Sequence, residues 1–128
     1  MNKLIIDVAN EKIFLMIITK DDIYNITNDN TKINFEKLTL IINNFLNSNS
    51  LKLDNINKIY VNRGPGSFAG IRNSLSVVKA FNVTKKIDYY CYSFEDFKDQ
   101  KDVKYEDIPK LCDKFKIKKN LIKPIYLS

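Results

Sequence analysis

The densest group of residues that could do chemistry lies in residues 61–72, which read VNRGPGSFAGIR. Gly64 and Gly66 permit backbone angles or close approaches that a Cβ atom would block, and Pro65 stiffens the turn between them. A glycine-rich loop that leads into a helix can bind phosphate through its N–H groups. However, the lysine of a Walker loop is absent, and the third glycine of GxGxxG would fall at Ala69. A close-packed turn that starts a helix is therefore the favoured interpretation.

Asp7 is the second candidate, because it ends the apolar run Leu4-Ile5-Ile6 of an expected strand. An acid at this position resembles the metal carboxylate of ribonuclease-H-like enzymes and the phosphate-handling acid of actin-like kinases. A two-metal site needs several carboxylates that converge on ions about 4 Å apart. The next expected strand ends in Asn62, and no acid follows it. We therefore favour a turn-forming carboxylate that accepts hydrogen bonds from backbone amides, with catalysis as the alternative.

The composition excludes several catalytic and metal-binding classes. The chain has 128 residues, no histidine and no tryptophan. Without histidine there is no His–zinc site, no imidazole base and no Ser-His-Asp triad. Cys91 and Cys112 are too few for a zinc site or a disulfide framework, so we expect free thiols. The apolar runs are too short to cross a bilayer, so we expect a soluble, cytoplasmic protein. We also expect that the chain alone binds no cofactor or metal.

Basic residues exceed acidic ones, 21 to 15, which gives a net charge of +6. All but two of these basic residues are lysines spread along the chain, and a solvated surface is the first interpretation of that pattern. From Ile108 to Ser128 there are six lysines and one acid, Asp113. Such a segment could contact the phosphates of an RNA, with Tyr126 stacking on a base. An RNA-binding accessory module therefore stays open as an alternative to a solvated tail.

The elements that must position these residues predict one small α/β domain. The runs Lys3–Val8, Ile13–Thr19 and Ile23–Thr27 favour three short strands in an antiparallel meander. The next elements are a helix from Phe35 to about Leu46 with Asn34 as its N-cap, a strand at Lys58–Asn62, a helix from about Phe68 to Phe81, a strand at Ile87–Tyr92, a short helix that includes Pro109 and ends near Phe115, and a closing strand at Ile122–Leu127. This order is typical of the half-domain that actin-like and ribonuclease-H-like folds share.

Both longer helices carry more apolar residues than one core contact requires. In the second helix, Phe68, Ile71, Leu75 and Val78 are expected to face the core. The surplus predicts an interface with another protein, unless the chain itself covers it. The candidate partner-binding residues are Leu38, Ile41, Phe45, Ser74, Val77 and Phe81.

The glycine-rich segment resembles the GPGSFTGxR…K signature of the TsaB family, also called YeaZ. The start of the chain is similar to that family's ILxIDTS strand, and residues 123–128 are similar to its PxYLR terminus. Ala69 replaces the usual Thr, and Val8-Ala9 replaces the usual Thr-Ser. The residues that carry the family motif are Asp7, Gly64, Pro65, Gly66, Ser67, Phe68, Gly70, Arg72 and Lys79.

The resemblance implies a non-catalytic scaffold subunit in the synthesis of threonylcarbamoyladenosine at position 37 of transfer RNA. Such subunits pair through two helices with TsaD, the catalytic transferase, and TsaE, an ATPase, joins the pair. Transfer RNA is then bound through the complex, and a nucleotide at the partner junction and a homodimer through the same helices both stay open. We expect residues 1–95 to form the actin-like (ASKHA-type) domain, and residues 96–128 to be a short basic segment in place of the family's second domain.

Overall fold

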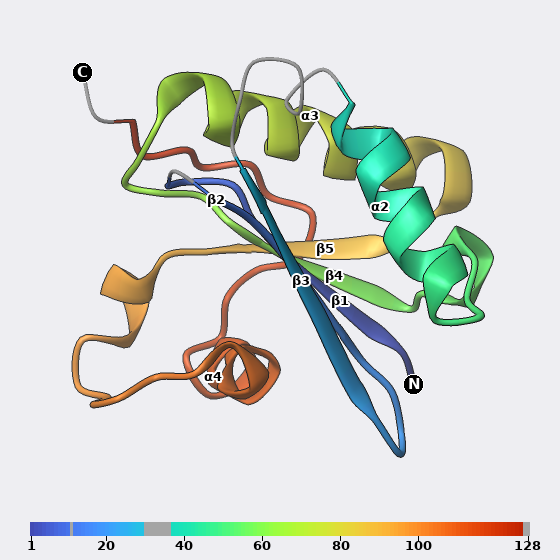
Figure 1. The fold of residues 1–128 in the computed structure, drawn as a ribbon. Helices are drawn as coiled ribbons and strands as arrows, with labels where there is room; N and C mark the ends of the chain where they lie inside the picture. Colours follow the sequence, from blue (N-terminus) through green and yellow to red (C-terminus); the bar gives the residue numbers. More distant parts are fainter. Residues whose placement is uncertain (11, 30–36, 127–128) are drawn as a thin grey trace.

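The computed structural model describes residues 1–10, 12–29 and 37–126. Its centre is a five-stranded sheet with the strand order β3-β2-β1-β4-β5 (Figure 1). The strands are β1 (Lys3–Asp7), β2 (Lys12–Ile18), β3 (Ile23–Asp29), β4 (Lys58–Asn62) and β5 (Asp88–Tyr92). The helices are α2 (Leu38–Ser48), α3 (Phe68–Lys85) and α4 (Ile108–Lys114), with short 3₁₀ turns η1 (Leu53–Asn55), η2 (Phe94–Phe97) and η3 (Tyr105–Asp107).

The sheet combines an antiparallel meander with parallel crossovers. β1 pairs with β2 and β2 with β3 in antiparallel register, whereas β4 pairs in parallel with both β1 and β5. Ile5, for example, lies opposite Met16 on one side and Tyr60 on the other. Since α3 leads from β4 to β5, the carboxyl ends of β1, β4 and β5 meet at one edge of the sheet. The predicted fold class, an actin-like or ribonuclease-H-like α/β half, is confirmed.

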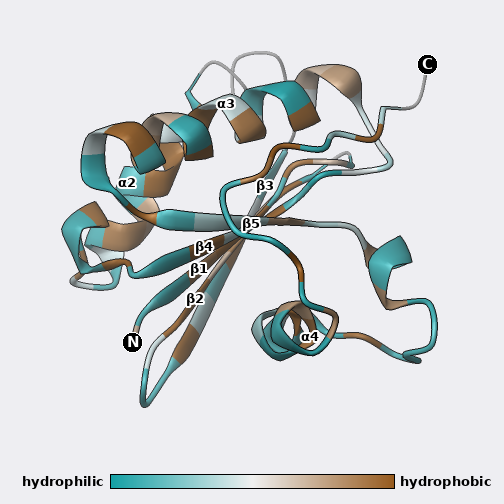
Figure 2. Ribbon diagram, turned by 180° about the vertical axis from the view of Figure 1, so that it is seen from behind, coloured by the Kyte–Doolittle hydropathy of each residue, from teal (hydrophilic) through white to brown (hydrophobic). Residues whose placement is uncertain are grey.

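Helices cover both faces of the sheet. Figures 1 and 2 show α2 and α3 on one side and α4 on the other, with the hydrophobic strands between them. The first core includes Leu4, Ile6, Ile42 and Val78, and residues of α2 and α3 close it. The second core joins sheet residues such as Tyr60 to α4 residues such as Leu111. The segment after β5 is therefore part of the same folded body as the sheet.

The observed elements differ from the predicted ones mainly in the helices and at the C-terminus. α3 continues to Lys85, past the expected end at Phe81, and ends with Lys86 in a left-handed conformation. The expected closing strand is replaced by loop with an isolated bridge between Tyr126 and Gly66. The predicted cap at Asn34, the helix start at Phe35 and the last two residues lie outside the described residues. Within the described residues, no helix combines the length and apolar character needed to cross a membrane.

Candidate functional site

The two motif glycines permit close backbone approaches within the molecule. Gly64 has a φ of +113°, and a Cβ atom there would clash with the carbonyl oxygen of Ile125. A Cβ atom at Gly66 would clash with the carbonyl oxygen of Ala9, which also accepts the Ser67 N–H at 2.9 Å. The loop after β4 therefore packs against both the turn after β1 and the C-terminal segment. These contacts support the structural interpretation of the loop.

The Ser67 side chain caps the start of α3, and the first aromatic residue of this helix is not in the core. The Ser67 hydroxyl accepts the Gly70 N–H at 3.2 Å, which satisfies one of the free amides of the first turn. Phe68 was expected to face the core with Ile71, and this was wrong because Phe68 lies at the surface. Its ring instead packs against Tyr126, with the centroids 4.6 Å apart.

Asp7 is the centre of a buried polar network at the carboxyl ends of β1 and β4. Its Oδ1 accepts the Ala9 N–H at 3.1 Å, and its Oδ2 accepts the Asn62 side-chain amide at 3.1 Å. The Asn62 Oδ1 in turn accepts the Gly64 N–H at 2.9 Å. Asp7 therefore joins two strand ends and the glycine loop. The predicted hydrogen bond from a backbone amide is present at Ala9, and the bond from the Asn62 side chain is additional.

The third partner of Asp7 comes from the far end of the chain. The Tyr105 hydroxyl donates to Asp7 Oδ2 at 2.6 Å, and the Tyr105 ring stacks on Phe14 with centroids 4.0 Å apart. Burial, followed by the charge of Asp7, raises the pKa of Tyr105 above its ordinary value, so this phenol stays a donor. Among the described residues, no three Asp, Glu or Cys side chains lie close enough together to hold a metal ion.

The predicted partner-binding residues are divided between the core and its margin. Leu38, Phe45, Ser74 and Phe81 are buried in the chain itself, so their predicted place on an outer surface needs correction. The reason is that α2 and α3 pack on one another as well as on the sheet, so each helix buries two neighbouring stripes. Ile41 and Val77 are partly buried at the margin of the same core.

A different set of side chains faces outward from α2 and α3, and we call this surface the helical face. Leu40 is 52% exposed on α2, and Val83 is 69% exposed on α3. Neither helix contains an acidic residue, and α2 contains no charged residue at all. Solvent-facing helices normally carry charges on their outer side, so an uncharged outer face is a feature of interfaces. The absence of charge from residues 38–48 was the sequence signal for this surface.

Arg72 and Lys79, the basic residues of the motif, lie in one pocket. This helix pocket, of about 230 Å³, lies between α3 and the C-terminal segment. Leu75 and Ser76 of α3 line it together with Ile122 and Tyr126. Arg72 also lies 5.8 Å from the Phe68 ring centre, within cation–π range. The polar side of α3 is thus hollowed here, and the C-terminal segment closes the pocket on one side.

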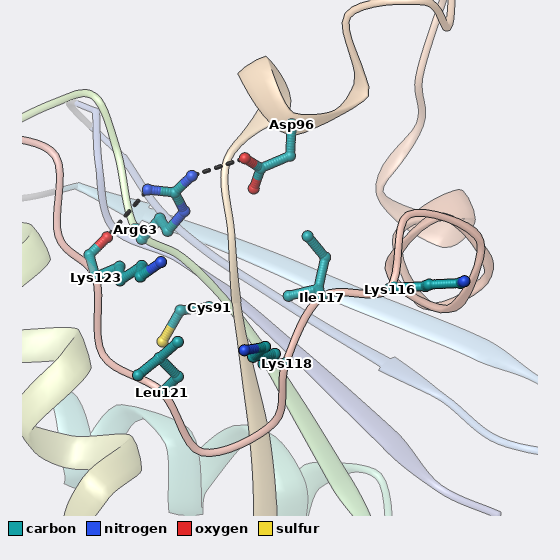
Figure 3. Close-up of a pocket in the computed structure, with 8 residues that line it drawn as sticks. All are labelled: Arg63, Cys91, Asp96, Lys116, Ile117, Lys118, Leu121 and Lys123. Carbon is teal, nitrogen blue, oxygen red and sulfur yellow. Dashed lines mark hydrogen bonds and ion pairs between the residues drawn. The ribbon is translucent and has the colours of Figure 1, made fainter.

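A second basic pocket lies beside the carboxyl end of β5, and part of its lining comes from the basic segment that the sequence left open as an RNA-binding module (Figure 3). Arg63 forms its upper wall, donating to Asp96 Oδ1 at 2.7 Å and to the Lys123 carbonyl at 3.1 Å. This β5 pocket has a volume of about 250 Å³, and its lining consists of Arg63, Cys91, Asp96, Lys116, Ile117, Lys118, Leu121 and Lys123. Its only sequence signal was the local excess of lysine, because the Arg63–Asp96 pair is formed by the fold.

Both cysteines are buried free thiols, as predicted. Burial raises the pKa of Cys91 to about 12, although it lies in the wall of the β5 pocket. Burial also raises the pKa of Cys112 to about 12, and Cys112 lies on the buried face of α4 in the second core. Thiols with such a pKa are protonated near neutral pH and are poor nucleophiles.

Comparison with known proteins finds a family model and solved structures that are similar to parts of this chain. Residues 32–93, just under half of the chain, match the model of the family TsaD: tRNA N6-adenosine threonylcarbamoyltransferase. No curated protein matches the chain. The fold is similar to YeaZ from Pseudomonas aeruginosa, with a TM-score of 0.67, 18% sequence identity and coverage of 72% of this chain. A second solved structure, of an uncharacterized protein with similarity to peptidase YEAZ from Pseudomonas aeruginosa, gives the same TM-score of 0.67, identity of 18% and coverage of 72%.

These matches confirm the resemblance to the TsaB (YeaZ) family that the glycine-rich motif predicted. The chain spans 43% of the length of each of these two structures. The residues that match the family model include α2, β4, α3 and β5. The helical face and the glycine-rich loop therefore lie within the matched part, whereas most of the β5 pocket is formed by residues that follow it.

Proposed function

We propose that this chain is a non-catalytic scaffold subunit that binds a TsaD-like transferase and supports it in forming threonylcarbamoyladenosine at position 37 of tRNA. The family-model match and the YeaZ-like fold support a role in this tRNA modification. The pairing and the scaffold role rest on the surface of this chain.

The observation that carries the proposal is the uncharged outer side of α2 next to α3. Thr39, Leu40 and Asn44 of α2 are exposed, and none of them is charged. On α3 the exposed side chains include the small Ala69, Ser76 and Ala80, which allow another helix to approach closely. A partner helix there could bury Leu40 and Val83 with no charge of α2 to desolvate, while Arg72 and Lys79 of α3 would lie at the margin of the contact. Desolvated charge is the main cost at the centre of an interface. In this arrangement Ile41 and Val77 form the floor of the contact.

The strand ends support a scaffold in place of an enzyme that uses Asp7. Ligands of open α/β sheets bind outside the carboxyl ends of the strands. Here Asn62, Tyr105 and the Ala9 amide of the chain itself bind Asp7. We further propose that residues 1–95 form the actin-like unit and that residues 96–128 cover its strand ends directly, in the place of the family's second domain.

The proposal includes two further components of the family's complex. A TsaE-like ATPase would join the pair, and a nucleotide would bind only where the two partners meet. Arg72 and Lys79 lie at the edge of the helical face, where they could meet acids of the transferase or the phosphates of that nucleotide. Transfer RNA would then reach the complex mainly through the transferase.

Co-expression with the TsaD homologue of the same organism tests the pairing. Size-exclusion chromatography at micromolar concentration should give one peak that contains both chains at equal amounts. The chain alone, run at the same concentration, shows whether a homodimer through the same helices competes with the pair. Separate elution of the two proteins would contradict the proposal.

A further inference from the structure

The C-terminal segment, residues 118–126, separates the two basic pockets. It is attached at both ends, because the Asn120 N–H donates to the Tyr89 carbonyl at 2.7 Å and the Ile125 N–H donates to the Arg63 carbonyl at 2.7 Å. Leu121 and Lys123 line the β5 pocket, whereas Ile122 and Tyr126 line the helix pocket. One stretch of chain is thus the shared wall of two pockets of similar size.

The charge in the β5 pocket is strongly positive. Four basic side chains line it against one acid, Asp96, and that acid is paired with Arg63. Within the part of the chain that the structure describes, Lys116, Lys118 and Lys123 make no ion pair. In Figure 3, Lys118 and Lys123 lie near Cys91 and Arg63, while the Lys116 side chain extends away from them. Lys118, Lys123 and Arg63 are therefore the cations that one bound anion could contact together.

The helix pocket repeats this charge on the other side of the segment. Arg72 and Lys79 line it, no acid does, and the Ser76 hydroxyl adds a hydrogen-bond donor. Tyr126 places an aromatic ring in the same wall. Proteins bind single-stranded nucleic acid with cations beside aromatic rings, with phosphates on the cations and a base on the ring.

We propose that residues 118–126 and the pockets on both sides form a binding surface for the sugar–phosphate backbone of RNA. Two open, cationic pockets on either side of one segment suit successive phosphates of a polymer better than a single small anion. Arg63 is held in place by Asp96 and by the Lys123 carbonyl, which use two of its five N–H donors. This proposal goes beyond the scaffold role and does not depend on it, because the surface belongs to this chain alone.

Fluorescence anisotropy with the full chain and a fluorescein-labelled 20-nucleotide oligouridine tests the surface directly. The variant Lys118→Gln/Lys123→Gln removes two charges from the β5 pocket, and Arg72→Gln/Lys79→Gln removes two from the helix pocket. Each should weaken binding about tenfold and make the slope of log K against log [salt] shallower by about 1.4, since each contact with a single strand contributes about 0.7. The matched control, Lys20→Gln/Lys101→Gln, removes two exposed lysines from the β2–β3 turn and from the loop before η3.

The control and the competitors decide among the outcomes. Equal losses in the control and in the pocket variants would show that only net charge matters, and would overturn the proposal. An unchanged salt slope in either pocket variant would remove that pocket from the surface. ATP and inorganic phosphate should displace the oligouridine only at concentrations far above that of the RNA. If ATP binds the wild-type chain as tightly as the oligouridine does, the pockets serve a free nucleotide and the RNA proposal is wrong.

Discussion

At the scale of single residues, Asp7 connects parts of the chain that lie far apart in the sequence. Its two oxygens are bound by the turn that follows it, by the end of β4 and by Tyr105. A buried carboxylate that loses one partner retains most of its desolvation cost without the compensating bond. The stability of the molecule should therefore be sensitive to the Tyr105 hydroxyl.

Replacing Tyr105 by Phe should lower the free energy of unfolding by about 1.5–3 kcal/mol, the usual contribution of a hydrogen bond to a charged group. The ring and its stacking on Phe14 are retained, so the loss reports the hydrogen bond alone. Urea unfolding followed by circular dichroism measures it. Tyr126→Phe, which removes an exposed hydroxyl, is the control and should leave the midpoint unchanged. An equal midpoint for wild type and Tyr105→Phe would show that Asp7 does not need this donor.

The two buried thiols predict a pH dependence of stability. Burial raises the pKa of Cys91 and Cys112 to about 12, whereas a thiol in the unfolded chain has its ordinary value of 9.0. Between these values the unfolded chain releases protons that the folded chain keeps. The unfolding free energy should therefore fall as pH rises above about 9, by about 1.4 kcal/mol per pH unit for each thiol.

Urea unfolding across this alkaline range checks the slope. In Cys112→Ala the unfolding free energy should fall less steeply with pH, by about 1.4 kcal/mol per pH unit, because one thiol is missing. Near neutral pH the unfolding free energies of the wild type and the variant should show the same dependence on pH. Ellman's reagent gives a second readout, because neither thiol should react at pH about 8 until the chain unfolds. Rapid reaction of both thiols in the folded protein would contradict the burial on which the prediction rests.

At the scale of elements, α2 and α3 each bury two stripes of side chains and expose a third stripe to solvent. The pairing proposal therefore depends on exposed side chains, not on the buried Phe45 and Phe81. Leu40→Asp and Val83→Asp place a charge where a partner helix would lie, and each should abolish co-elution with the transferase. Both side chains are more than half exposed, so the unfolding free energy should change by less than about 0.5 kcal/mol.

Ile23→Asp is the matched control for these two variants. Ile23 is an aliphatic side chain of β3 that is 47% exposed, and it lies outside the two helices. Its substitution should leave the pair intact. Loss of pairing in all three variants would indicate a general effect of added charge, and normal pairing of both helix variants would exclude this face as the interface.

The elements also show how far sequence reasoning extends. The strands and the order of the fold could be predicted because apolar runs, periodicity and turn residues are local signals. The burial of Ser74 and Phe81 could not, because a helical period does not tell which stripe meets a second helix. The contact between Tyr105 and Asp7 joins residues 98 positions apart, and no local pattern encodes it. The glycine motif was informative because Gly64 and Gly66 mark close backbone approaches.

At the scale of the whole molecule, one sheet has three different neighbours. α2 and α3 cover one face, with an outer side that is uncharged on α2, and α4 covers the other face. The C-terminal segment closes the edge at which the parallel strands end, and it carries the basic pockets. In our account a transferase would bind the outer side of α2 and the adjoining side of α3, while RNA would bind the C-terminal segment, and Arg72 and Lys79 lie where the two surfaces meet.

The most direct test of the scaffold role is the formation of threonylcarbamoyladenosine by the purified TsaD homologue, given its substrates and unmodified tRNA, with and without this chain. Nucleoside mass spectrometry after digestion of the tRNA measures the product. We predict at least about a tenfold increase with the wild-type chain, equivalent to about 1.4 kcal/mol of transition-state stabilisation, and no increase with Leu40→Asp. Equal product in the presence and absence of the chain would contradict the account.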